Sequence, residues 1–334
     1  MAARRWGRRK AWLVVIGVGV VLALVCYLAV RFIRSVSPDE CTAHGTDGST
    51  VSLDLDQASH AATVAAVAHA RGLPERAVTI ALATAIQESK LRNLGYGDRD
   101  SLGLFQQRPS QGWGSPAQIR DPVYASGKFF DALVKVPDYL GLPVTVAAQQ
   151  VQRSGYPEAY AQHEDMAATL AAVLSGREGP ALSCTVAGAE VTAAPTGADA
   201  AGAEAAGAGA AGADATAAGA SGAGGTASAA PGRGTGVTAA VRREFGRVPA
   251  PVSVPGGVTY PVDEPATGWA LALWLVCHAT ALHATSVTFE GRRWNSAMSD
   301  HGWTRTTSAP ASGETSAVAV TVASGVRPVQ AAGP

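Results

Sequence analysis

Residues 74–106, PERAVTIALATAIQESKLRNLGYGDRDSLGLFQ, join an apolar helix to a loop rich in glycine and aspartate. Pro74 is favoured in a first helical turn, and the apolar residues after it recur at helical spacing. Glu88 falls at the margin of this apolar stripe. We expect its carboxyl group to be partly desolvated, which raises a carboxyl pKa. An acid of this kind can protonate the leaving oxygen of a glycosidic bond, whereas the simpler interpretation is a solvated glutamate at a helix end.

The loop that follows is predicted to be a turn because of its glycines and aspartates. Gly103 would let the backbone approach a ligand closely, and the amide of Gln106 can both donate and accept hydrogen bonds. Aromatic residues of the kind that pack on sugar faces lie in and after this loop, with ordinary core packing as their alternative role. Together these features favour a sugar-binding surface beside Glu88.

Residues 58–184 are predicted to form an all-α domain. Ala-rich and amphipathic runs recur through this region, and its roughly 120 residues are enough to build a core of their own. Residues 34–57 contain Pro38, Gly45 and Gly48 as breakers and are interpreted as a polar spacer.

The N-terminus predicts a single-pass membrane protein. Residues 1–10 are strongly basic, and residues 11–33 contain about 20 uncharged residues, enough for roughly 30 Å of helix. The basic flank is expected to stay in the cytoplasm, so that the bulk of the chain lies outside the cell. A cleaved secretory signal is the alternative.

Two cysteines bracket the helical region. Cys41 and Cys184 could form a disulfide outside the cell, and two unpaired thiols are the alternative. Cys277 lies in an apolar run and is interpreted as a small buried residue rather than a reactive one.

The last third of the chain is predicted to be a linker followed by a smaller module. Residues 185–235 are mostly Ala, Gly, Thr, Ser and Asp, a composition typical of a disordered linker. Residues 236–326 carry a helical run from about Thr267 and two strand-like runs, which predicts a small α+β module. Residues 327–334 are interpreted as a tail.

The pair Glu88–Ser89 followed by Gly-Leu-Phe-Gln at residues 103–106 resembles the pattern of lytic transglycosylases and goose-type lysozymes. That resemblance implies a lysozyme-like fold, peptidoglycan glycan strands as substrate, and Glu88 as the catalytic acid and base. The segment GYGD resembles a goose-type motif and implies Asp98 as a second catalytic residue. Goose-type enzymes have a further acid where this chain has Arg108, and this departure favours the transglycosylase route.

The substrate-contacting residues that we expect lie on the same segments and in the later helices. Transglycosylases carry an Ala-Tyr-Asn triplet late in the domain, and here only Tyr160 in EAYAQ corresponds to it. The expected set is Ser89, Tyr96, Ser101, Gly103, Phe105, Gln106, Trp113 and Tyr160.

Several classes of function are disfavoured by the sequence. Lys plus Arg and Asp plus Glu both number 26, so no net charge attracts the chain to nucleic acid. His278 and His283 are poorly spaced for two ligands on one helix face, and we expect no metal and no cofactor. The expected partners are peptidoglycan, the membrane, and a cell-wall protein at the C-terminal module. The alternatives to a transglycosylase are a lysozyme-type hydrolase and a non-catalytic peptidoglycan-binding or scaffold protein.

Overall fold

The computed structural model describes residues 19–20, 22–27, 39–153, 157–186, 234–246, 248, 250–306 and 316–323. The predicted cytoplasmic segment 1–10, most of the predicted membrane anchor 11–33, nearly all of the predicted linker 185–235 and the predicted tail 327–334 lie outside these residues. Residues 19–20 and 22–27 are helical. No helix within the described ranges has both the length and the apolar character needed to span a bilayer.

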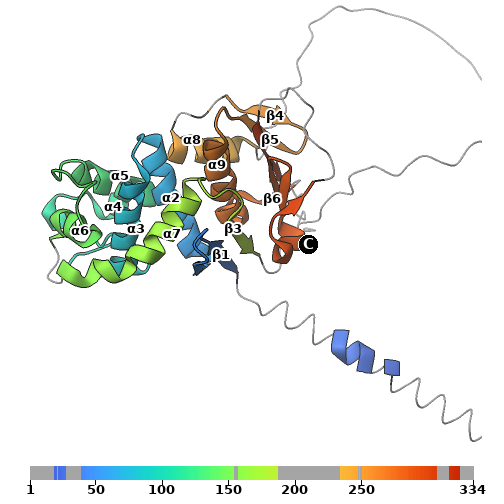
Figure 1. Cartoon of the computed structure of the whole chain (residues 1–334), viewed down its shortest axis with the longest axis horizontal. Coiled ribbons are helices and arrows are strands. Elements are labelled where there is room, and N and C mark those ends of the chain that lie inside the picture. The colour runs from blue at the N-terminus through green and yellow to red at the C-terminus, as the bar shows by residue number, and fades with distance from the viewer. Residues whose placement is uncertain are drawn as a thin grey trace, which may run out of the picture.

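The elements follow one another along the chain as shown in Figure 1. The helices are α2 (Leu55–Ala70), α3 (Glu75–Ser89), α4 (Pro116–Ile119), α5 (Pro122–Leu133), α6 (Val144–Gln152), α7 (Glu164–Leu174), α8 (Gly234–Phe245), α9 (Pro265–Cys277) and α10 (Ala279–Leu282), with short 3-10 helices η1 (Pro109–Gln111), η2 (Pro157–His163) and η3 (Ser296–His301). The strands are β1 (Glu40–His44), β2 (Thr50–Asp54), β3 (Leu182–Thr185), β4 (Val252–Val254), β5 (Gly257–Pro261), β6 (Ala284–Phe289), β7 (Arg292–Asn295), β8 (Thr304–Arg305) and β9 (Ala317–Val322).

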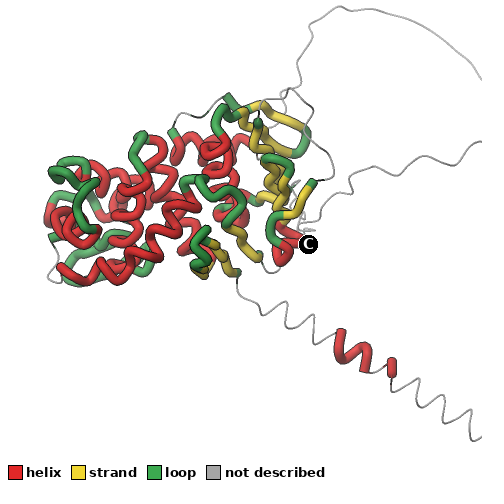
Figure 2. The backbone as a smooth tube through the Cα atoms, in the orientation of Figure 1, coloured by secondary structure: helices red, strands yellow, loops and turns green. Residues whose placement is uncertain are grey.

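The expectation of an all-α lysozyme-like domain after a transmembrane helix, with a separate α+β module, is wrong. The described chain is a mixed α+β structure with a helical part and two antiparallel sheets, one of three strands in the order β2-β1-β3 and one of six. Figures 1 and 2 show helices α3 to α6 at one end and most of the strands at the other, with α8 and α9 next to the strands. One continuous core of buried side chains runs through both ends.

The three-stranded sheet begins in the stretch that the sequence predicts to be a polar spacer. Strands β1 and β2 occupy part of the stretch interpreted as a spacer, and each alternates buried and exposed residues as a half-buried strand does. The breakers Gly45 and Gly48 form the turn between the two strands, where the Gly48 amide donates to the Gly45 carbonyl over 3.0 Å. They end one strand and start the next, so they mark a hairpin rather than an irregular segment.

The six-stranded sheet has the order β4-β5-β9-β6-β7-β8. The last strand of the chain, β9, lies between β5 and β6 and pairs antiparallel with both. Helix α9 packs against this sheet, and its residues from Gly268 to Cys277 are all buried. A helix that is apolar all round, like α9, is stable in water only when neighbours cover every side.

Helix α2 provides the neighbour on the other side of α9. It is rich in alanine, contacts α5 and α3 in the helical part, and also contacts α8 and α9. Alanine side chains are small, so helices can approach α2 closely from both directions. The helical part and the six-stranded sheet are therefore joined through α2 as well as through the core.

A buried polar cluster lies where α2, α8 and α9 meet. His278 stacks on Trp274 with ring centroids 4.4 Å apart, and its Nε2 lies 3.4 Å from Oγ1 of Thr63. The indole of Trp274 donates to Glu244 over 2.7 Å. Burial lowers the pKa of His278, which favours the neutral ring that accepts a hydrogen bond from Thr63.

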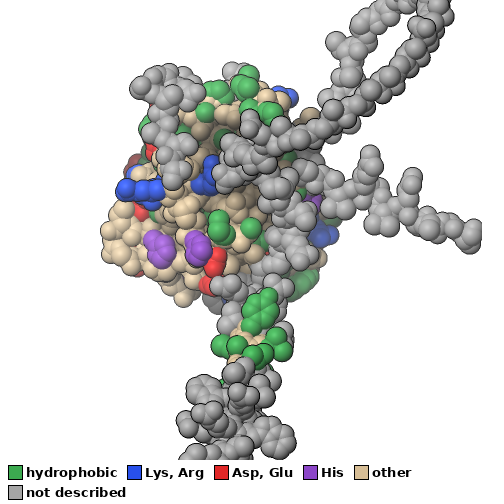
Figure 3. Space-filling view, turned by 90° about the vertical axis from the view of Figure 1, so that its right-hand side faces the viewer, with side chains coloured by type: hydrophobic (Ala, Val, Ile, Leu, Met, Phe, Trp, Pro, Cys, Tyr) green, Lys and Arg blue, Asp and Glu red, His purple; other side chains and the backbone are tan. Residues whose placement is uncertain are grey.

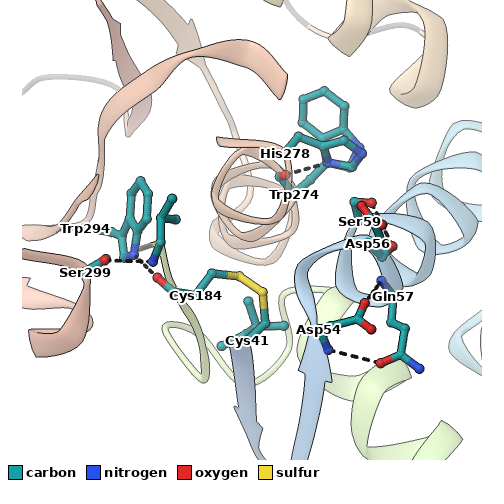
Figure 4. Close-up of a disulfide and its surroundings, with 12 residues drawn as sticks. Cys41, Asp54, Asp56, Gln57, Ser59, Cys184, Trp274, His278, Trp294 and Ser299 are labelled. Atoms are coloured by element: carbon teal, nitrogen blue, oxygen red, sulfur yellow. Dashed lines mark hydrogen bonds between the residues drawn. A yellow bond between two sulfur atoms is a disulfide. The ribbon is translucent and has the colours of Figure 1, made fainter. Parts of the chain in front are cut away.

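A disulfide joins Cys41 of β1 to Cys184 of β3, at directly opposed positions of the two strands (Figure 4). The strand that carries Cys184 is also bound to the C-terminal part. The indole of Trp294 donates to the Cys184 carbonyl over 3.0 Å, and the indole of Trp303 donates to the Leu182 carbonyl over 2.7 Å. Thus the disulfide joins two strands of the three-stranded sheet, and the two indole hydrogen bonds hold β3 against the C-terminal part.

Charged side chains are scattered over the surface on the side of the C-terminal sheet. Where described side chains are visible in Figure 3, this face is mostly uncharged, with separate Lys or Arg and Asp or Glu side chains and histidine side chains near one another. The described side chains that this view shows form no extended basic surface of the kind that binds nucleic acid.

Candidate active site

Helix α3 places Glu88 in its last turn. The helix is buried along almost its whole length, from Ala77 to Ile86, because α2, α5, α6 and α7 pack around it. It ends at Ser89 since Lys90 and Leu91 both take positive φ values, 55° and 59°. This abrupt end leaves the side chain of Glu88 half-buried at the edge of the core.

The carboxyl group of Glu88 is held by two neutral hydrogen-bond donors. The hydroxyl of Tyr160, from η2, donates to Oε1 of Glu88 over 2.7 Å, and the side-chain amide of Gln152, at the end of α6, also bonds to it. Burial raises the pKa of Glu88, while these two hydrogen bonds oppose the rise. The carboxyl group therefore has a fixed orientation and a raised pKa. Among the described residues, no cation forms an ion pair with it.

The loop of residues 103–106 is tied directly to the end of α3. The hydroxyl of Ser89 donates to the Leu104 carbonyl over 2.7 Å and lies 3.0 Å from the Ala85 carbonyl. The amide of Gln152 donates to the Phe105 carbonyl over 2.7 Å. Gln152 therefore connects the loop backbone to the Glu88 carboxyl group.

Gly103 allows the loop of residues 103–106 to lie close to the end of helix α4. Its φ is +75°, and a Cβ atom added there would be 2.6 Å from the Ile119 carbonyl oxygen at the end of α4. Its amide donates to the Leu94 carbonyl over 2.7 Å. A side chain at position 103 is excluded by both the backbone conformation and this contact.

Two of the expected sugar-contacting residues have structural roles instead. The side chain of Phe105 is fully buried and stacks on Phe129 with ring centroids 4.7 Å apart, so it belongs to the core and cannot line an open cleft. The amide of Gln106 lies 3.3 Å from the Tyr96 carbonyl and 3.2 Å from the Gly103 carbonyl, both of which it bonds. Gln106 thus stabilises the loop itself.

The remaining expected residues are spread around the loop. Tyr96 is 73% exposed, whereas Ser101 is buried. The side chain of Asp98 is 92% exposed and lies 3.9 Å from Arg99. The structure brings Glu88, Ser89, Tyr160 and the loop backbone together, and no described hydrogen bond joins Asp98 to Glu88.

Arg108 has a partner that the sequence reasoning did not identify. Asp100 accepts hydrogen bonds from the Ser110 amide over 2.8 Å and from Nε of Arg108 over 2.7 Å. These bonds, with the Ser110 hydroxyl, hold the pKa of Asp100 well below its ordinary value. Arg108 therefore closes the far end of the loop by an ion pair.

Gln152 is the site residue that the sequence reasoning missed. A signal for it exists, because in helix α6 the buried residues are Val144, Ala147, Ala148 and Val151. Position 152 is four residues after Ala148 and adjoins Val151, so it lies at the edge of the buried stripe, as Glu88 does in α3.

A groove of about 700 Å³ lies beside Gln152, bounded by the end of α5, the end of α6 and the segment around η1. Trp113 is half-buried in its wall. A second hollow, of about 690 Å³, lies between the β1–β2 hairpin and α7 and contains none of the expected site residues. Gln152 lines the first of these hollows, whereas Glu88 and the loop of residues 103–106 line neither of them.

Within the described ranges, no group of three or more His, Cys, Asp or Glu side chains is arranged to hold a metal ion. A scan of the chain against protein-family models finds no match, and a search of curated proteins also finds none.

Proposed function

We propose that this protein cleaves peptidoglycan glycan strands by lytic transglycosylase chemistry, with Glu88 as general acid and then general base. The observation that carries the proposal is the half-buried Glu88 carboxyl group, which two neutral donors hold beside the loop of residues 103–106. A carboxyl group with a raised pKa keeps its proton near neutral pH, as a general acid must.

The reaction would proceed in two proton transfers. Glu88 first donates its proton to the oxygen that bridges two amino sugars, and the bond from that oxygen to the anomeric carbon breaks. The resulting carboxylate then accepts the proton of the C6 hydroxyl on the same sugar, whose oxygen forms a bond to the anomeric carbon. The products are a free hydroxyl on the leaving sugar and a 1,6-anhydro end on the other, with Glu88 protonated again.

Tyr160 and Gln152 orient the carboxyl group of Glu88 for both proton transfers. Each donates a hydrogen bond to Glu88, so the carboxyl group keeps one orientation as acid and as base. Hydrogen bonds from neutral donors also limit the cost of the carboxylate that forms between the two steps.

The exposed position of Asp98 favours this route over hydrolysis. A hydrolase needs a second group to orient water beside the anomeric carbon, and Asp98 points into solvent without a described bond to Glu88. The disulfide between Cys41 and Cys184 favours an oxidising compartment outside the cytoplasm, where peptidoglycan lies.

The test is digestion of purified peptidoglycan by the full chain, with mass spectrometry of the released fragments. We expect 1,6-anhydro ends, which are one water lighter than reducing ends. Glu88→Gln should slow release by roughly 100- to 10,000-fold, the usual contribution of a general acid. Glu158→Gln, at an exposed glutamate two residues before Tyr160, is the matched control and should retain activity.

Other outcomes would replace the proposal. Fragments with reducing ends would identify a hydrolase. Binding of glycan without any release by the unaltered chain would identify a peptidoglycan-binding or scaffold protein.

A further inference from the structure

Two half-buried histidines lie at the contact between the helical part and the C-terminal part. His60 is on α2, and His278 directly follows the last residue of α9. Helices α2 and α9 pack against each other, and this contact joins the two parts of the chain. A titratable side chain on each side of one contact makes its stability depend on pH.

Each of the two rings is held by its Nδ1 atom. Nδ1 of His278 donates to the Trp274 carbonyl over 2.9 Å (Figure 4), and Nδ1 of His60 donates to the Leu91 carbonyl over 2.8 Å. A carbonyl only accepts hydrogen bonds, so Nδ1 carries the proton in both neutral rings. A further proton must therefore bind at Nε2, which in His278 lies 3.4 Å from the hydroxyl oxygen of Thr63 on α2.

A positive charge on His278 is unfavourable at this contact. The Thr63 hydroxyl can turn to accept a hydrogen bond from a protonated Nε2, but it does not replace the water that would solvate the charge. Burial lowers the pKa of His278 and that of His60, and a charge on His60 lowers the pKa of His278 further. Glu244 of α8 favours the charged ring of His278, but burial has the larger effect.

The other charged groups on α2, α8 and the end of α3 do not remove this cost. Asp54 and Asp56, at the start of α2, favour a charge on His60, but less than burial disfavours it. Arg92, just past the end of α3, pairs with Asp54. The two arginines of α8, residues 242 and 243, are exposed.

The remaining described elements that pack against α9 place no charge beside His278. Strands β3, β6 and β9 and helix α10 contain no ionisable side chain other than Cys184, which is in the disulfide. Helix α7 meets α9 near its own C-terminal end, where Gly176 lies against α9, whereas its acids are in its first turn. At the far end of α2, burial also lowers the pKa of His69, which lies against α8.

We propose that His60 and His278 form an acid-sensitive contact between α2 and α9, closed while both rings are neutral and opened when Nε2 of His278 takes up a proton. The indole hydrogen bonds of Trp294 and Trp303 to β3 do not titrate, so the six-stranded sheet stays joined to β3 while α9 separates from α2. This device goes beyond the proposed function, because it does not depend on the reaction at Glu88.

The closed contact should lose stability as pH falls below about 6.5, the ordinary pKa of histidine. The pKa values of both histidines are lowered in the closed state, so the open state binds protons that the closed state does not. At neutral pH neither state binds these protons, and the contact keeps its full stability.

Cys277 is a probe for the opening of this contact. It is nine residues after Gly268, and at about 100° per residue the two lie on opposite sides of α9. Gly268 packs against the ring of Phe289 in the six-stranded sheet, so Cys277 faces away from the sheet. Its thiol is buried, and burial raises its pKa to about 12, so it reacts only when α9 loses its cover.

The experiment measures how fast a dithiodipyridine reagent modifies Cys277 at pH 5 and at pH 7.5. The full chain carries Cys26→Ser, because Cys26 is the other free cysteine of the described residues. Each rate is divided by that of the same chain unfolded in urea, which removes the effect of pH on the thiol itself. We expect this ratio to be roughly threefold or more higher at pH 5 than at pH 7.5.

His278→Asn should remove most of this rise, because the asparagine amide can donate to the Trp274 carbonyl but takes up no proton. His60→Asn should reduce the rise for the same reason, and it is the second variant if His278→Asn does not fold. His163→Asn is the matched control. His163 is a half-buried histidine of η2 whose pKa is also lowered by burial, but it bonds to Gln87 of α3, and its loss should leave the rise intact.

Three outcomes would overturn the inference. The ratio could be equal at the two pH values, or the rise could survive in both His60→Asn and His278→Asn. If His163→Asn removes the rise as completely as His278→Asn does, Cys277 reacts through global unfolding rather than through this contact. No glycan enters the measurement, so its result is separate from that of the proposed function.

Discussion

The hydroxyl of Tyr160 donates a 2.7 Å hydrogen bond to Oε1 of Glu88, although 72 residues separate them in the chain. Glu88 ends the central helix α3, and Tyr160 is fully buried in η2. The bond therefore connects the acid to a rigid part of the core. It lowers the pKa of Glu88 against the larger effect of burial, so Tyr160 sets how acidic the group is.

Replacing Tyr160 by phenylalanine should raise the pKa of Glu88. The ring remains to fill the core, while the donor that stabilises the carboxylate is lost, at a stability cost of about 1 kcal/mol. The measurement is carbon NMR of labelled glutamate, with Glu88→Gln used for assignment. Tyr260→Phe, at a fully buried tyrosine in strand β5 of the six-stranded sheet, is the control. An unchanged Glu88 pKa in Tyr160→Phe would contradict this role.

Glu88→Gln should make the protein more stable at pH 8. Because the pKa of Glu88 is raised above its unfolded value near 4.5, the folded chain holds this proton to higher pH than the unfolded chain does. Stability is therefore lost as pH rises through the interval above 4.5, and glutamine, which does not titrate, avoids that loss. The gain should disappear below pH 4.5.

Urea unfolding of both chains between pH 4 and pH 8 measures this difference. Glu158→Gln, at an exposed site, should show no comparable pH-dependent gain. If the Glu88→Gln chain is less stable than the unaltered chain across this range, burial does not disfavour the charged form of Glu88 and the prediction is wrong.

Removing the disulfide should destabilise the protein strongly. Cys41 and Cys184 are 143 residues apart, and closing a loop of this length stabilises by roughly 4–5 kcal/mol in the chain-entropy model. Cys41→Ala with Cys184→Ala should lower the free energy of unfolding by that amount, measured in urea.

Reduction of the disulfide in the unaltered chain should lower the free energy of unfolding by the same amount. Cys277→Ala, at a buried free cysteine, provides the control for losing a small apolar side chain. A double alanine variant as stable as the unaltered chain would mean that the pairing of β1 with β3 alone holds the sheet.

Gly103→Ala should cost more than Gly48→Ala, although both glycines have positive φ. At Gly48, with φ +87°, nothing lies within 4 Å of an added Cβ, so the cost is the left-handed conformation alone, about 1–2 kcal/mol. At Gly103 the Cβ would also meet the Ile119 carbonyl at 2.6 Å, and we expect a total of about 3 kcal/mol.

The loop of residues 103–106 must then move away from Ser89 and Gln152, so glycan cleavage should fall in Gly103→Ala and not in Gly48→Ala. Urea unfolding and fragment release measure the two effects. Equal losses of stability at both glycines would show that the contact with α4 imposes no constraint.

The local sequence contains enough information to locate several elements. Strands β6 and β9 and helix α9 form where alternating or apolar runs predict them, and α3 ends at Ser89 after the run that contains Glu88. These features depend on the period of the side chains along one element, which is present in any short window of sequence. The margin position of Glu88 follows from the same period.

Other features depend on which elements meet. Strand β1 pairs with β3, which lies far along the chain, and β9 lies between β5 and β6. The order of strands in either sheet therefore cannot be predicted from the sequence of the individual strands. Phe105 is apolar whether it faces a cleft or a core, and only the packing of α5 against the loop decides that it stacks on Phe129.

By itself, then, the sequence determined the course of α3 and α9 and that an acid lies at the edge of α3, because helical periodicity is local. Only the tertiary structure decided that Tyr160 and Gln152 hold this acid and that Asp98 faces solvent. The reason is that hydrogen bonds and burial depend on distance in space, and residues far apart in the chain become neighbours only when the elements pack.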